Sequence, residues 1–145
     1  MELHDEVAVR LAGLEQRYTA GRRAIVEVLE RSDRPLTVPE MIDAADPGSL
    51  PVSSAYRNLV VLLDAGVVHR VAGTDDHGRF ELAEDLAGHH HHLLCDSCGI
   101  VADISAYPRL ERALADAARM ARDETGFEVT GHRIDLLGQC EACRA

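Results

Sequence analysis

The sequence contains no lysine, so arginine supplies all 15 of its basic side chains. It also lacks any apolar run of about 18 residues, which excludes a membrane-spanning helix. The chain begins with acidic, amphipathic sequence, and no basic and apolar secretory leader is visible there. We therefore expect a cytoplasmic protein with reduced cysteines, which argues against disulfide bonds.

Positive charge is scarce, and the net charge of −10 argues at face value against nucleic-acid binding. The imbalance is uneven along the chain. Residues 1–71 have eight arginines and eleven acids, a net of −3, whereas residues 72–145 have seven and fourteen, a net of −7. Divalent cations bound in the second half would offset part of its negative charge. The composition therefore weakens a DNA-binding hypothesis without excluding it.

All four cysteines occur in two Cys-x-x-Cys pairs, Cys95 with Cys98 and Cys140 with Cys143. Two intervening residues let both thiolates of a pair reach one tetrahedral ion from a tight turn. The 42 positions from Cys98 to Cys140 are too many for a small independent finger. A redox site would need only one pair, within a βαβ pattern. The two pairs therefore predict one structural Zn²⁺ site that clamps the end of a domain to its middle.

Four consecutive histidines, His89 to His92, directly precede Leu93, Leu94 and the first cysteine pair. This context predicts a β-strand, in which alternate side chains point to opposite faces. His89 and His91 would then share one face, and His90 and His92 the other. One tetrapeptide could therefore supply two different metal sites, although a solvated polar strand end is the alternative interpretation.

Helical spacing of apolar residues recurs through the first 64 residues. Helices are expected at 2–16, from Thr19 to about residue 31, from Thr37 onward, and from Ser53 to about residue 64. Thr37 and Glu40 form the pattern of a capping box. Strands are expected at 67–71 and 79–82, with a turn at 75–78. Helices followed by a β-hairpin predict a winged helix-turn-helix domain over residues 1–83.

The remainder of the chain alternates between strand and helix patterns. After a hinge linker at 84–88, strands are expected at 89–95, 100–104 and 127–137, with a helix at 108–124. The pattern predicts a small α/β domain over residues 89–145, and an α+β class for the whole chain. About 55 residues bury little apolar surface by themselves, so we expect this domain to dimerise.

The fourth expected helix begins with polar side chains that suit contact with DNA, namely Ser54, Tyr56, Arg57 and Asn58. In a helix-turn-helix domain, the N-terminal residues of the recognition helix meet base edges and phosphates. A solvated helix end is the alternative interpretation of the same residues.

Together these residues resemble the Fur-type metalloregulators over about residues 14–143. The matching motifs are RYTAGR at residues 17–22, SSAYRNL at 53–59, HHHHLLCDSCG at 89–99 and GHRIDLLGQCEAC at 131–143. The resemblance implies a homodimeric, metal-responsive transcriptional repressor with a winged helix and a C-terminal dimerisation domain. Its implied contacts with operator DNA are Arg17, Thr19, Arg22, Ser53, Ser54, Tyr56 and Arg57.

The resemblance also implies three metal positions. Cys95, Cys98, Cys140 and Cys143 match the structural zinc site. His90 and His92 match two ligands of a regulatory site at the domain hinge. The ligands matched to a third site are His89, His91, His132 and an acid on the helix, for which Glu111 is the candidate although it is one residue from the usual spacing.

The remaining ligands of the regulatory site bear on which metal is sensed. Iron sensors of the family commonly have a histidine near the start of the third helix, where this chain has Leu36 and Thr37. His69 instead resembles a ligand of the zinc-uptake regulators, with an exposed strand histidine as the alternative. Glu81 matches a family ligand before the linker. Because the linker is slightly long, Glu84 and Asp85 are alternatives to it.

The expected function is a repressor of metal-uptake genes that binds operator DNA as a homodimer when its regulatory site is loaded with Zn²⁺. A zinc hydrolase would need an open metal position, a pocket and a general base, so we do not expect an enzyme. An iron, manganese or nickel sensor and a peroxide sensor are alternatives on the same fold.

Overall fold

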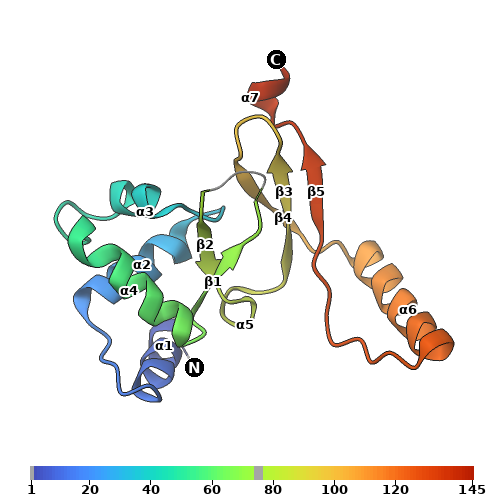
Figure 1. Cartoon of the computed structure of the whole chain (residues 1–145), viewed down its shortest axis with the longest axis horizontal. Helices are drawn as coiled ribbons and strands as arrows, with labels where there is room; N and C mark the ends of the chain where they lie inside the picture. The colour runs from blue at the N-terminus through green and yellow to red at the C-terminus, as the bar shows by residue number, and fades with distance from the viewer. Residues whose placement is uncertain (1, 74–76) are drawn as a thin grey trace.

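Helices fill the N-terminal half of the computed structural model, which describes residues 2–73 and 77–145 (Figure 1). The helices are α1 (Leu3–Ala12), α2 (Ala20–Arg31), α3 (Val38–Ala44) and α4 (Val52–Asp64). They are followed by an antiparallel hairpin of β1 (Val68–Val71) and β2 (Arg79–Leu82). Its expected turn at 75–78 lies partly outside the described residues. This half is the predicted winged helix, and the hairpin is its wing.

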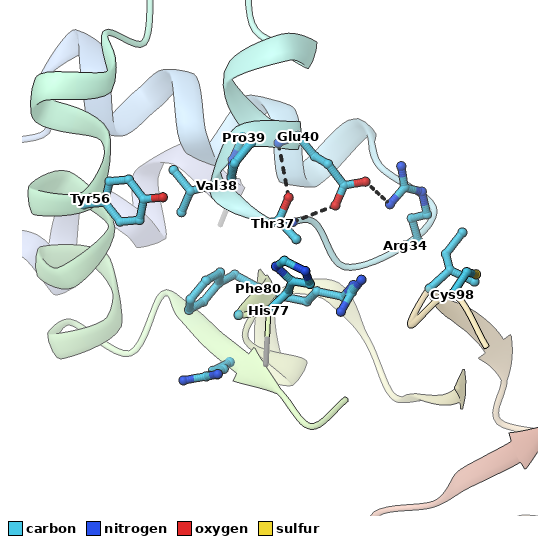
Figure 2. A pocket seen from close by; sticks show the side chains of 13 residues that line it. Arg34, Thr37, Val38, Pro39, Glu40, Tyr56, His77, Phe80 and Cys98 are labelled. Carbon is cyan, nitrogen blue, oxygen red and sulfur yellow. Dashed lines mark hydrogen bonds and ion pairs between the residues drawn. The ribbon is translucent and has the colours of Figure 1, made fainter. Parts of the chain in front are cut away.

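Threonine side chains determine where α2 and α3 begin, as the sequence predicted. Thr19 Oγ1 accepts a hydrogen bond from the Arg22 amide at 3.4 Å. Thr37 Oγ1 accepts one from the Glu40 amide at 3.3 Å, and the Glu40 carboxylate accepts one from the Thr37 amide at 3.0 Å. Each cap satisfies amides that the helix leaves unpaired. The α3 cap, with Arg34 bound to Glu40, lines an open cavity of about 760 Å³ that also borders Cys98 (Figure 2).

One apolar core joins the four helices to the wing. Its most buried side chains include Leu11 of α1, Val26 of α2, Met41 of α3, Leu62 of α4 and Val67, which directly precedes β1. An isolated antiparallel bridge pairs Leu36, which precedes α3, with Phe80 of β2. The amide of Leu36 donates to the Phe80 carbonyl at 3.0 Å, so the start of α3 is fixed to β2.

A three-stranded sheet organises the second half, in the order β4-β3-β5. The central strand β3 (His90–Cys95) pairs antiparallel with β4 (Val101–Ser105) and parallel with β5 (Asp135–Gly138). Helix α6 (Pro108–Thr125) projects away from the sheet and has no buried residue (Figure 1). The short helix α7 (Glu141–Arg144) ends the chain. None of the described helices is long and apolar enough to cross a membrane.

Three expected boundaries are wrong. Helix α1 ends at Ala12 instead of residue 16, and α4 begins at Val52, one residue before the expected Ser53. The strand expected over 127–137 is limited to β5 and excludes His132. A strand needs a partner for its backbone groups, and β5 pairs with β3 only from His92 to Cys95. The predicted linker at 84–88 contains a turn of helix, α5 (Glu84–Ala87).

Candidate metal centres and DNA interface

The four cysteine thiols converge at the end of the sheet. Cys95 and Cys98 flank the turn after β3, where Gly99 has φ of 77°, and Cys140 and Cys143 flank the start of α7. The four sulfur atoms lie within 4.8 Å of one another, and all four cysteines are free thiols. Cys98 Sγ is 3.8 Å from Cys140 Sγ. Tetrahedral Zn²⁺ with Zn–S bonds of about 2.3 Å separates its sulfur ligands by about 3.8 Å.

Backbone amides point at the most buried of these sulfur atoms. Cys95 Sγ accepts hydrogen bonds from the amides of Cys98 at 3.5 Å and Cys140 at 3.4 Å. These amides lower the pKa of Cys95 to about 6, whereas the neighbouring thiols, Cys140 first, raise the pKa of Cys143 to about 12. A thiolate is the form that binds metal. The two amides therefore favour the thiolate form of Cys95, which is the form that a structural Zn²⁺ ion would bind.

A second group of donors bridges the wing and the sheet. Glu81 of β2, His90 and His92 of β3, and Asp103 of β4 each offer one ligand atom, all within 4.8 Å of one another. The Glu81 carboxylate is 2.9 Å from His90 Nε2 and 3.1 Å from His92 Nε2. Asp103 Oδ1 is 3.6 Å from both imidazoles. We name this group the hinge site.

Glu81 is the central residue of the hinge site. Burial would raise the pKa of this carboxyl, but hydrogen bonds from His69, His92 and His90 hold it well below its usual range. His69 Nε2 is 2.8 Å from Glu81 Oε1, although His69 is not among the four donors that lie within 4.8 Å of one another. The two alternatives to Glu81 point elsewhere. Glu84 contacts His89, and Asp85 pairs with Arg10.

Asp103 was missed by the sequence analysis. Its strand was expected, but its register against β3 was not, and only the register places it opposite His92. Burial raises the pKa of the Asp103 carboxyl. Asp103 is an exposed residue, but its carboxylate lies beside two imidazoles. This position suits a cation, because a bound positive charge would offset the desolvation of the acid.

A third group lies on the other side of β3, and we name it the lateral site. His89 and His91 meet Glu111 of α6 and His132, with ligand atoms within 4.8 Å of one another. Glu111 lies 2.6 Å from His91 Nε2, 3.0 Å from His89 Nε2 and 2.8 Å from His132 Nε2. His91 first, then the other imidazoles, lower the pKa of the Glu111 carboxyl.

The histidine run thus divides by parity as expected, and both resulting groups suit a metal. In the lateral site, His89 Nε2 lies 3.0 Å from His132 Nε2, so two imidazole nitrogens face each other beside one carboxylate. The imidazole nitrogens and carboxylate oxygens of this site are donors of the kind that bind Zn²⁺ in mixed histidine and carboxylate sites. Nitrogen and oxygen donors also suit other divalent transition metals.

The candidate DNA residues occupy the surfaces of two helices. Ser53, Tyr56 and Arg57 on α4 are exposed, as is Arg17 before α2, whereas Ser54 is partly buried. Arg22 is engaged within the domain, because its Nε donates to Asn58 Oδ1 at 3.3 Å and its Nη1 to the Arg17 carbonyl at 2.7 Å. Thr19 is the cap of α2. Thr19 thus begins α2, and Arg22 links the start of that helix to α4, which carries the exposed side chains.

Comparison with known proteins gives concordant results. Residues 13–137 match the Ferric uptake regulator family. The chain is 33% identical over 146 residues to the peroxide-responsive repressor PerR of Staphylococcus aureus, covering 99% of this chain and 92% of that protein. It superposes on the ferric uptake regulator Fur of Helicobacter pylori with a TM-score of 0.79 and 20% identity, covering 99% and 92% of the two chains. A zinc-bound manganese uptake regulator gives 0.67 and 27%, covering 97% and 99%.

Proposed function

The chain belongs to the ferric uptake regulator family, and from that premise we propose that it senses Zn²⁺ and represses metal-uptake genes. Members of this family are metal-responsive transcription regulators that bind DNA as dimers, and they are not enzymes. The proposal assigns DNA binding to residues 1–83, the hinge to 84–88, and dimerisation with metal binding to 89–145.

One observation carries the proposal, namely that the hinge site draws its donors from both halves of the chain. Glu81 belongs to the wing, whereas His90 and His92 belong to the sheet. When bound, a divalent ion supplies the positive charge that these donors share. Glu81 then holds the wing against β3, with His69 beside it at 2.8 Å. We infer that His69, Glu81, His90 and His92 form the regulatory site, and that Asp103 adds a further carboxylate.

Fixing the wing against the sheet would fix the DNA-binding surface. In a dimer, the angle between the two halves sets the spacing of the recognition helices against successive major grooves. Metal increases the population of the conformation that can bind DNA only to the extent that it binds that conformation more tightly than the alternative one. Exposed Arg57 and Tyr56 on α4 would then contact the operator, and excess metal would repress uptake.

The dimer interface is proposed from the surface of α6. Leu114, Ala117, Ala118 and Ala121 line a groove on this helix, which has no buried residue in the single chain. Leu136 and Leu137 of β5 are 53% and 68% exposed. Apolar side chains at helical spacing that remain exposed indicate a surface that a second copy covers.

Zinc is the favoured ion because it accepts histidine and carboxylate ligands in tetrahedral geometry, and because His69 resembles a ligand of the zinc-uptake regulators. Peroxide sensing with bound iron is the second candidate. Two observations favour it: the second carboxylate, Asp103, and the 33% identity to a peroxide-responsive repressor. Nitrogen and oxygen donors also suit iron.

The test is DNA binding by the full chain, using a duplex selected from a random pool, while free Zn²⁺, Fe²⁺, Mn²⁺ or Ni²⁺ is titrated. A zinc sensor binds DNA at the lowest free concentration of Zn²⁺ and gains no mass after peroxide treatment. A peroxide sensor binds DNA with iron, and its iron-loaded form gains oxygen on a histidine after peroxide. Identical DNA binding with and without every metal would refute both candidates.

A further inference from the structure

Helix α5 contains two neighbouring acids, Glu84 and Asp85, whose side chains contact different parts of the chain. Glu84 contacts Nδ1 of His89, whose Nε2 faces the lateral site. Asp85 forms a two-point ion pair with Arg10 of α1, at 2.5 Å from Nη2 and 3.4 Å from Nη1. Helix α5 lies where the chain passes from the wing to the three-stranded sheet (Figure 1). A single helical turn therefore contacts a metal-site histidine and the first helix of the DNA-binding half.

Arg10 ties α5 to more than one part of that half. Its Nη1 donates to the Gly66 carbonyl at 2.8 Å, directly after α4, and its Nε donates to Glu6 at 3.0 Å. The arginine side chain is only 21% exposed, although Asp85 is 66% exposed. An isolated exposed ion pair contributes little, but a guanidinium with three partners forms a network of fixed geometry. Arg10 thus links α1, the end of α4, and α5.

The other side of α5 supports metal ligands through their second nitrogen. An imidazole that donates from Nδ1 to a carboxylate keeps the lone pair of Nε2 available for a metal. Glu84 provides this contact for His89. The Gly88 carbonyl lies 3.1 Å from His90 Nδ1 and provides it for the hinge site. Gly88 itself ends α5, with its amide 2.7 Å from the Glu84 carbonyl and a φ of 93° that favours glycine.

We propose that α5 is a strap that couples the lateral site to α1. Glu84 is a positioning residue that orients His89, and the Asp85–Arg10 pair joins the same helical turn to the DNA-binding half. Occupation of the lateral site therefore restrains α1 and the end of α4. The inference rests on the proposed function, in that residues 89–145 bind metal. It takes Zn²⁺ as the ion of the lateral site and assigns that site an effect of its own on the DNA-binding half.

The first experiment measures hydrogen exchange in the full chain with His90→Ala, which disables the hinge site and leaves the lateral site. Adding Zn²⁺ is expected to slow amide exchange in α1 and α5 by about fivefold, the usual lower range of coupling between sites. Adding Arg10→Gln or Asp85→Asn is expected to abolish the slowing in α1 and preserve it at β3. Asp85→Asn keeps the other two Arg10 contacts, so it tests the pair without loss of the network.

The second experiment measures Zn²⁺ affinity in the same His90→Ala background by chelator competition. Glu84→Ala is expected to weaken binding by about tenfold or more, as for removal of other outer partners of ligating histidines. Glu84→Gln keeps an acceptor for His89 Nδ1 and should recover most of the affinity. Glu15→Ala, which removes an exposed acid between α1 and α2, is the control and should leave Zn²⁺ affinity unchanged.

The outcomes separate this proposal from the regulatory one. The strap would be overturned if Zn²⁺ slowed amide exchange in α1 equally in His90→Ala alone and with Arg10→Gln or Asp85→Asn added. Equal Zn²⁺ affinity in Glu84→Ala and Glu15→Ala would also overturn it. Neither measurement uses DNA. If Zn²⁺ slows amide exchange in α1 only when Asp85 is present, but does not alter DNA binding by the unsubstituted protein, the strap stands and the zinc-sensor proposal fails.

Discussion

His92 of β3 lies opposite Asp103 of β4 in the antiparallel register, with Nε2 3.6 Å from Oδ1. Asp103→Asn keeps the size of this side chain and removes its charge. We expect it to weaken metal binding at the hinge site by about tenfold. Zn²⁺ titration should be compared with Asp43→Asn, an exposed acid of α3. Equal affinities in the two variants would exclude Asp103 from the metal site.

Cys98→Ser should remove the structural Zn²⁺, because the site closes only with all four sulfur atoms and metal binding is coupled to folding. The protein is expected to unfold or become monomeric, as measured by zinc content and sedimentation. Ser97→Ala is the matched control, since it changes the adjacent residue and loses only a hydrogen bond from Gln139. A stable Cys98→Ser dimer with its full zinc content would disprove the four-cysteine site.

Arg57→Ala should weaken DNA binding and leave zinc content and dimerisation unchanged, because the side chain is exposed on α4. If Arg57 contacts a phosphate, the slope of log affinity against log salt should fall by about one. Arg119→Ala on α6 removes the same charge from the other half and serves as the control. Operator affinity that is equal in the two variants would remove Arg57 from the interface.

The parity of the histidine run can be tested by three single variants. His69→Ala and His90→Ala should each abolish metal-dependent DNA binding while the structural zinc and the dimer persist. His89→Ala should have a milder effect, since it belongs to the lateral site with His91, Glu111 and His132. The measurement is operator binding as free Zn²⁺ is titrated. If His69→Ala responds like the parent protein and His89→Ala does not, the two sites exchange roles.

The capping box of α3 predicts acid sensitivity. Burial would raise the pKa of Glu40, but hydrogen bonds from Thr37 and the nearby Arg34 lower it below its ordinary value of 4.5. A carboxylate with a depressed folded pKa stabilises the fold above its unfolded pKa, and this contribution is lost as pH falls further. Glu40→Gln should therefore reduce the loss of stability below about pH 4.5, measured by urea unfolding. Thr37→Ala should cost about 1 kcal/mol at pH 7.

Local signals predicted much of the site and of the fold. Thr19 and Thr37 cap their helices because side-chain capping depends on a few adjacent residues. The alternation of His89 to His92 follows from strand geometry alone. What failed depends on distant partners. Strand β5 extends only over the four residues that pair with β3, and Asp103 is found only when the register of β4 is known. Helix α5 is a single turn, too short to show periodicity.

The central position of β3 also bears on how the two sites can diverge in related sequences. Both edges of the strand are paired, so its backbone cannot slide to absorb a change in length. Replacing one histidine alters one site and spares the other. The insertion or deletion of one residue within the run instead moves every later side chain to the opposite face. Either site can therefore be altered by substitution, whereas a one-residue change in the length of the tetrapeptide disrupts both sites at once.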